Sequence, residues 1–137
     1  MKRMNVIVAG SRTVTDYAHV KSCLDNILLD EKAKVVIISG TAKGADKLGA
    51  KWAIETDGIE LAEMPAQWDR YGKSAGYRRN EDMARLATHV IVFWDGSSVG
   101  SQHMINSAKK RELPLRILAA APAPEATETA DLFTQDA

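Results

Sequence analysis

The sequence predicts an α/β domain in which helices cover both faces of a parallel sheet of about five strands. Short apolar runs rich in β-branched residues recur along the chain. They do not alternate with polar residues, which is typical of strands buried on both faces. Amphipathic segments separate these runs. Such regular alternation of strand and helix indicates right-handed βαβ units, and it predicts a Rossmann-like, three-layer fold.

Three apolar runs predict strands strongly, and two shorter or less apolar runs predict them weakly. The strong runs are residues 5–9, 34–38 and 89–94, and the weaker ones are residues 59–64 and 115–118. Between them, apolar residues recur three or four positions apart, which predicts helices over residues 16–30, 46–56, 75–87 and 101–111. In the third helix Asn80 shares the face of Met83 and Ala87, so we expect its amide to point inward near the strand ends.

The predicted elements fall in one domain, residues 1–118. Residues 119–137 contain proline, alanine and acidic residues but few large apolar ones. Such a segment cannot bury enough apolar surface to offset the entropy lost on ordering. We therefore expect a disordered tail from residue 119 onward.

The overall composition excludes several classes of protein. Eighteen lysines and arginines balance eighteen aspartates and glutamates, so no global charge favours nucleic acid or a membrane surface. No apolar run reaches the roughly 18 residues of a membrane span. The single Cys23 permits no internal disulfide, and the three scattered histidines show no metal-site spacing. We expect a cytoplasmic protein without a metal or a cofactor.

In an open parallel sheet, ligands bind beyond the carboxyl ends of the strands. The first predicted strand ends in Gly10, Ser11 and Arg12. The glycine permits a tight turn, and the guanidinium of Arg12 matches the geometry of a phosphate or carboxylate. An ordinary turn with a solvated arginine explains this loop equally well.

The second predicted strand runs into a loop with two glycines four positions apart, followed by a helix. The candidate ligand-binding residues of this loop are Ser39, Gly40, Thr41, Lys43, Gly44 and Asp46. Small residues permit close approach of a ligand, and a helix start offers unpaired N–H groups and a positive dipole end. The alternative is that Asp46 simply caps the helix.

The loop after the fourth predicted strand carries the strongest local signal. Its candidate residues are Asp95, Gly96, Ser97, Ser98, Gly100 and Ser101. Two glycines bracket hydroxyl side chains directly before a helix, so N–H groups, hydroxyls and the helix dipole would converge on one anion. The alternative is a serine- and glycine-rich turn without a ligand.

Residues 65–80 form a long polar and aromatic stretch, and loops of this length in compact domains are often functional. Trp68, Tyr71 and Tyr77 could stack on a base, and Arg79 and Asn80 could contact a ligand. Alternatively, the aromatic residues anchor the loop over the edge of the sheet.

Taken together and in this order, these segments resemble the SLOG superfamily of Rossmann-like proteins, and within it the YspA-like branch. The matching positions are residues 8–12, 39–46, 52–53, 65, 68, 71–73, 75–76, 79–80, 93–98 and 100. The resemblance implies binding of a nucleotide or a nucleotide-derived ligand, such as ADP-ribose or a nucleoside monophosphate. It also implies an association with phages, plasmids or other mobile elements.

Some relatives in this superfamily cleave an N-glycosidic bond, and the cytokinin-activating branch carries the pattern Pro-Gly-Gly-x-Gly-Thr-x-x-Glu. Laid on residues 96–104, this pattern places Met104 where the catalytic glutamate belongs. A thioether cannot transfer the proton that acid–base catalysis needs. Asp46, Glu81 and Asp95 remain as substitutes without a spacing argument that selects one, and His103 could pair with an anion.

Three functions therefore stay open. The first is a sensor or sequestering protein for a nucleotide-like molecule, the second is a nucleotide N-glycosidase, and the third is a nucleic-acid-associated module, which the neutral composition disfavours. Apolar helix faces permit a homo-oligomer. In the tail, residues 130–133 are similar to the end of the peptide that docks on the bacterial sliding clamp, although Thr129 stands where that motif expects glutamine.

Overall fold

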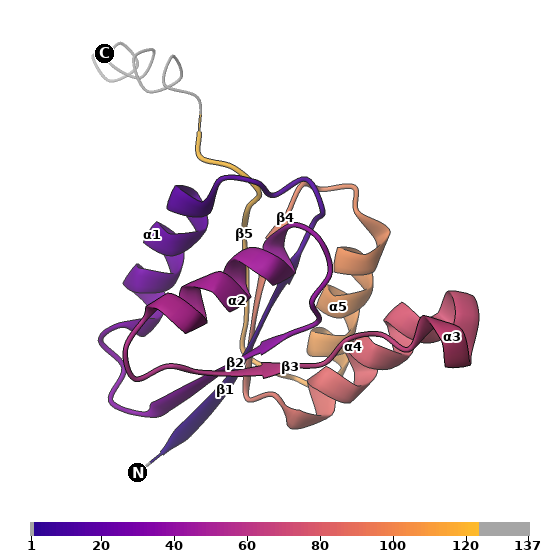
Figure 1. Ribbon diagram of the computed structural model, residues 1–137, viewed down its shortest axis with the longest axis horizontal. Coiled ribbons are helices and arrows are strands. Elements are labelled where there is room, and N and C mark those ends of the chain that lie inside the picture. Colours follow the sequence, from indigo (N-terminus) through magenta and orange to yellow (C-terminus); the bar gives the residue numbers. More distant parts are fainter. Residues whose placement is uncertain (1, 124–137) are drawn as a thin grey trace.

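The computed structural model describes residues 2–123 and shows helices packed on both faces of one parallel sheet (Figure 1). The sheet has five strands in the order β3-β2-β1-β4-β5. Their bounds are β1 (Arg3–Gly10), β2 (Lys34–Ser39), β3 (Glu60–Glu63), β4 (His89–Trp94) and β5 (Leu115–Ala119). Every neighbouring pair is parallel, as the alternation of strands and helices predicts.

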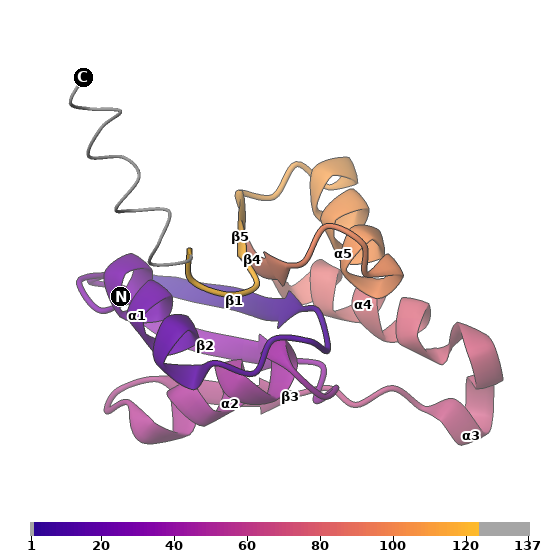
Figure 2. The ribbon, with the colours of Figure 1, turned by 90° about the horizontal axis from the view of Figure 1, so that it is seen from above.

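The helices form two layers (Figure 2). Helices α1 (Tyr17–Leu28) and α2 (Ala45–Glu55) cover one face, and α4 (Ala75–Leu86) and α5 (Val99–Lys110) cover the other. A short helix α3 (Trp68–Tyr71) and a 3₁₀ turn (Gly72–Ser74) precede α4. The Rossmann-like three-layer fold is therefore confirmed.

The core consists of two apolar clusters, one on each face of the sheet. Successive residues of β1 point to opposite faces, so Val6 and Val8 join the cluster under α1 and α2, while Ile7 and Ala9 join the cluster under α4 and α5. All four side chains are buried. This double burial explains why the strand reads as a continuous apolar run.

Most predicted bounds shift by one or two residues, and three differences from the sequence prediction bear on the site and on the end of the domain. Helix α5 begins at Val99, not at residue 101, because the carboxylate of Asp95 accepts the N–H groups of Ser97 and Ser98 and turns the chain into the helix early. The stretch 65–80 is largely helical, since it contains α3, the 3₁₀ turn and the start of α4. Strand β5 extends to Ala119, whose carbonyl oxygen lies 2.8 Å from Nε2 of His19.

Most of the segment predicted as a tail, and with it the clamp-like residues 130–133, lies outside the described residues. Within the described part, no helix has the length and apolar character that crossing a membrane requires.

Trp52 of α2 is the largest fully buried side chain of the core, and its Nε1–H donates to Oδ1 of Asp25 at 2.9 Å. We predict that Trp52→Phe lowers the free energy of unfolding by about 1–3 kcal/mol, because it leaves a void and removes a hydrogen bond. Urea denaturation measures this loss. The matched variant Trp68→Phe, at a residue that is 55% exposed, should change stability by less than about 0.5 kcal/mol. Equal effects of the two substitutions on the free energy of unfolding would contradict the burial of Trp52 in the core.

Candidate functional site

The carboxyl ends of β1, β2 and β4 meet at one edge of the sheet, and Ser11 joins them. Its backbone N–H donates to the carbonyl oxygen of Phe93 at 2.9 Å, and its hydroxyl oxygen accepts the N–H of Asp95 at 3.1 Å. Its carbonyl oxygen accepts the N–H of Ala45, at the start of α2, at 3.3 Å. The three loops that the sequence singles out are thus bonded to one another through one fully buried serine.

Two glycines permit this close packing of backbone on backbone. A Cβ atom at Gly10 would overlap the carbonyl oxygen of Phe93, and one at Gly44 would overlap the carbonyl oxygen of Ser11. Both glycines have positive φ, of 156° and 91°. Their place in the structure is explained by contacts between loops, without any ligand.

Asp95 accepts hydrogen bonds from N–H groups that are predicted from the sequence to bind a phosphate. Its Oδ1 accepts the N–H groups of Ser97 and Ser98, each at 2.9 Å, and its Oδ2 accepts the hydroxyl of Thr13 at 3.0 Å. The bonds from Ser97 and then from Ser98 lower the pKa of Asp95 to about 2. The carboxylate is therefore ionised at neutral pH, and the first half of this loop is closed by its own side chain.

At the start of α5, the backbone N–H groups are not used by other parts of the described chain. Within residues 2–123, no acceptor takes the N–H groups of Val99, Gly100 or Ser101. Val99 and Gly100 are exposed, and a Cβ atom at Gly100 would meet nothing within 4 Å, so this turn has room for an added group beside Gly100. The helix that follows has 12 residues, and its dipole makes this end positive. The N–H groups of this loop that remain available to an anion are therefore those of the first turn of α5, a few residues beyond Gly96 and Ser97.

Asp46 is buried between the loops of β1 and β2, with 5% of its surface exposed. It is not the helix cap that the alternative interpretation of this loop requires, since Gly44 is the N-cap residue of α2. Its Oδ2 instead accepts the N–H of Ala42 at 3.1 Å. Burial raises the pKa of Asp46 to about 6, although the Ala42 N–H and the charge of Arg79 oppose the rise.

Gly40 lies beside both the Asp46 carboxylate and the guanidinium of Arg79. A Cβ atom at Gly40 would lie 2.5 Å from Nη1 of Arg79 and 2.8 Å from Oδ2 of Asp46. Nη1 of Arg79 also donates to the carbonyl oxygen of Gly40. Thr41, the next residue, has a positive φ of 64°, and its N–H donates to the hydroxyl oxygen of Ser39 at 3.2 Å. The β2 loop is thus held from both sides by buried polar groups.

Asn80 points inward from α4, as its spacing predicts, and is 7% exposed. Its Oδ1 accepts Nε–H of Arg79 at 3.0 Å, and its Nδ2 lies 3.2 Å from Nδ1 of His103 on α5. Both ends of the amide are therefore engaged, which sets its orientation.

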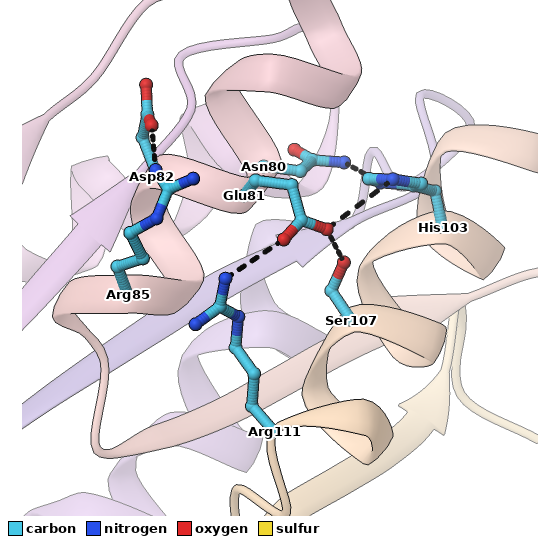
Figure 3. A network of polar contacts seen from close by, with 7 residues as sticks. All are labelled: Asn80, Glu81, Asp82, Arg85, His103, Ser107 and Arg111. Atoms are coloured by element: carbon cyan, nitrogen blue, oxygen red, sulfur yellow. Dashed lines mark hydrogen bonds and ion pairs between the residues drawn. The ribbon is translucent and has the colours of Figure 1, made fainter.

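Glu81 links α4 to α5 on the side of the His103 ring that faces away from Asn80 (Figure 3). Its carboxylate accepts the hydroxyl of Ser107 and, at 3.1 Å, Nη2–H of Arg111, and it lies 3.8 Å from Nε2 of His103. The bonds from Ser107 and Arg111 lower the pKa of Glu81. Glu81 therefore joins two helices as an ionised group and is not available as an acid.

A cavity of about 210 Å³ lies beside the first turn of α5. Trp68, Lys73, Gly76, Tyr77, Asn80 and Gly100 line it. The sequence prediction names three of these as site residues, Trp68, Asn80 and Gly100. The sequence prediction also names Tyr77 as a residue that could stack on a base, and the structure places it in the same cavity.

The remaining predicted residues lie apart from this cavity. Arg12 and Lys43 are exposed on the loops of β1 and β2. Met104, at the position where the hydrolase pattern has glutamate, is 1% exposed and packs in the apolar cluster under α4 and α5. Among the described residues, no group of three or more histidine, cysteine or acidic side chains could hold a metal ion.

Comparisons with known proteins agree with the resemblance seen in the sequence. The family described as "YspA, cpYpsA-related SLOG family" matches residues 4–71. The Gene 61 protein of Mycobacterium phage D29 is 32% identical over 115 residues, which cover 80% of this chain and 92% of that protein. The expected connection with phages is therefore present in a relative.

A solved structure of DNA processing protein A from Helicobacter pylori, described for its single-stranded DNA binding mode, has the same fold. The match has a TM-score of 0.64 and 19% sequence identity, and it covers 97% of this chain and 73% of that chain. At this identity the likeness concerns the fold alone.

The raised pKa of Asp46 makes stability depend on pH. A carboxyl group that binds its proton more tightly in the folded chain favours folding at acidic pH, and this contribution is lost as the pH rises from about 4 to above about 6. Relative to Asp46→Asn, the protein should lose roughly 2–3 kcal/mol of stability over this range. Chemical denaturation between pH 4 and pH 7.5 measures the difference.

Asp95→Asn provides the opposite control, because the pKa of Asp95 is lowered in the folded chain. The unsubstituted protein should be more stable than Asp95→Asn at neutral pH, and this difference in stability should decline only as the pH falls below about 4. A pH-independent difference between the protein and Asp46→Asn would show that the Asp46 carboxylate is hydrated and not buried.

Proposed function

The chain belongs to the YspA, cpYpsA-related SLOG family, and we propose that it binds a nucleotide or nucleotide-derived molecule, such as a nucleoside monophosphate or ADP-ribose. The phosphate would lie against the first turn of α5, at the carboxyl edge of the sheet. In this proposal the protein acts as a sensor or a sequestering protein and does not convert its ligand.

One observation carries the proposal: three successive N–H groups at the start of α5 have no acceptor within residues 2–123, and there is room for an added group beside Gly100, the middle one of the three. This position lies after β4, where the sheet order changes direction relative to β1, and open α/β sheets bind ligands at such a switch point. Lys73 lines the adjacent cavity and would add a positive charge. A phosphate is the ligand group that this combination of donors and charge suits best.

The residues at the candidate catalytic positions near the site support binding without chemistry. Met104 is in the core, Glu81 is ionised between two helices, and Asp95 is ionised and engaged by Ser97, Ser98 and Thr13. A general acid must hold a proton at neutral pH and reach the leaving group. None of these three residues meets both conditions.

One observation favours a second candidate, a nucleotide N-glycosidase. Burial raises the pKa of Asp46 to about 6, close to neutral pH, where a group can both donate and accept a proton. Asp46 lies at the carboxyl edge of the sheet, but it is enclosed by the β1 and β2 loops. Catalysis would therefore require those loops to open.

Gly100→Asp tests the proposed phosphate position. The new carboxylate would occupy the open space and repel a phosphate, so binding of AMP and ADP-ribose should fall at least about tenfold by isothermal titration calorimetry. An acidic residue in the first turn of a helix is favourable to the helix by about 0.3–1 kcal/mol, so thermal stability should not decrease.

Gly58→Asp is the charge control. Gly58 also faces open space but lies in the turn before β3, at the edge of the sheet opposite the proposed phosphate position. Its φ of 83° makes a side chain there strained, so Gly58→Asp should lower stability by about 1–2 kcal/mol. It introduces the same charge and should leave affinity unchanged. Unchanged affinity in Gly100→Asp would refute the phosphate position.

The two candidate functions differ in a direct assay. We expect no release of free base when the protein is incubated with AMP, NAD or ADP-ribose and the products are separated by chromatography. If base were released, and Asp46→Asn abolished the release while nucleotide binding persisted, the binding-only proposal would be wrong and the second candidate correct.

A further inference from the structure

We infer that the cavity between Trp68, Tyr77 and the start of α5 holds the nucleobase of a free nucleotide. The base would be enclosed by the aromatic side chains while the phosphate meets the first turn of α5. This inference rests on the proposed function, and it adds the part of the ligand that a phosphate site cannot distinguish.

Two large aromatic side chains that line the cavity are exposed to water. Trp68 is 55% exposed and Tyr77 is 44% exposed, whereas Trp52 is fully buried. The indole of Trp68 packs close to Gly76, where a Cβ atom would lie 3.4 Å from its Cη2. The ring of Tyr77 is held against that of His103, with 4.5 Å between the ring centroids. Both rings are therefore positioned before a ligand arrives, and each can stack on a planar group.

The size of the cavity matches one part of a nucleotide. Its volume is about 210 Å³, below the roughly 300–1,000 Å³ of pockets that enclose drug-sized ligands. A single base fits this space better than a whole nucleotide. Gly100 lines the same cavity and also belongs to the first turn of α5, so a base inside it would place the attached sugar and phosphate toward the unpaired N–H groups.

Asn80 supplies the polar contact that a base requires. An amide offers two donor hydrogens and two acceptor positions, and contacts with Arg79 and His103 use one of each. One donor and one acceptor remain, in an orientation that these two neighbours fix. Nucleobases carry donors and acceptors side by side along their edges, which is how asparagine recognises adenine in other settings.

The charges around the cavity favour a free nucleotide over a nucleic-acid strand. A strand would need a row of available cations to follow its phosphates. On α3 and α4, however, Arg70 and Arg78 lie over the ring of Tyr71, and Arg85 pairs with Asp82. Arg79 donates to Gly40 and Asn80. Lys73, in the 3₁₀ turn between these helices, is the one basic side chain among the residues that line the cavity, which suits one phosphate group.

The experiment titrates the full chain with AMP, adenosine and ribose 5-phosphate, and it follows affinity by calorimetry and the tryptophan emission by fluorescence. Because Trp52 and Trp94 also emit, the change assigned to Trp68 is the part that is absent in Trp68→Phe. AMP should bind most tightly and quench the emission. Ribose 5-phosphate should bind about five- to a hundredfold more weakly, the range that base–aromatic stacking spans, and leave the emission unchanged. A short deoxyadenosine oligonucleotide should bind no more tightly than AMP.

Two variants locate the base. Trp68→Ala should reduce the affinity for AMP to that for ribose 5-phosphate and leave ribose 5-phosphate unaffected. Trp68→Phe retains an aromatic ring and should keep most of the preference for AMP. Because Trp68 is largely exposed, neither variant should impair folding.

The alternative outcomes separate this inference from the proposed function. If AMP and ribose 5-phosphate bound equally and Trp68→Ala changed neither, the base site would be wrong and the phosphate site would stand. If adenosine bound and quenched the emission but ribose 5-phosphate did not bind at all, the base site would stand and the phosphate position would fail. Tighter binding of the oligonucleotide than of AMP would replace the free nucleotide with a strand, and no binding of any probe would overturn both proposals.

Discussion

The hydrogen bonds by which Ser11, at the end of β1, holds the end of β4 and the start of α2 are the constraint on which the rest of this edge depends. One residue donates to β4, accepts from the loop after β4 and accepts from the start of α2. These contacts bring backbone against backbone, so Gly10 and Gly44 cannot carry a side chain without overlap. The glycines are thus required by the fold itself, before any ligand is considered.

This constraint determines which polar groups a ligand can still use. The loops of β1 and β2 are filled by their own contacts, including the buried carboxylate of Asp46, and Asp95 takes the N–H groups of Ser97 and Ser98. What remains is the first turn of α5, where the chain has no side chain at residue 100 to cover its N–H groups. A count of the donors already used therefore selects the proposed phosphate position more sharply than the number of glycines and serines in a loop does.

Burial and helical spacing determine which parts of the fold and the site could be predicted from the sequence alone. The strands were predictable because burial on both faces leaves a continuous apolar run, and Asn80 was predictable as an inward residue because helical spacing fixes its face. The early start of α5 was not, since it depends on a carboxylate that turns back onto its own loop. Nor was the cavity, because Trp68 and Gly100 are brought together by the packing of α4 against α5 and share no local pattern.

The polar contacts between α4 and α5 bear on what kind of binding this site can support. Arg79, Asn80 and His103 form a continuous chain of contacts from the β2 loop to α5, and Glu81 anchors its far end through Ser107 and Arg111. A group held in this way cannot reorient freely, so little ordering entropy is lost when a ligand contacts it. Rigidity of this kind favours affinity and selectivity for one shape of ligand. Catalysis by the enclosed Asp46 would instead require the surrounding loops to open, and rigid contacts oppose such opening. The rigidity of these contacts is therefore the physical reason to prefer a sensing or sequestering role.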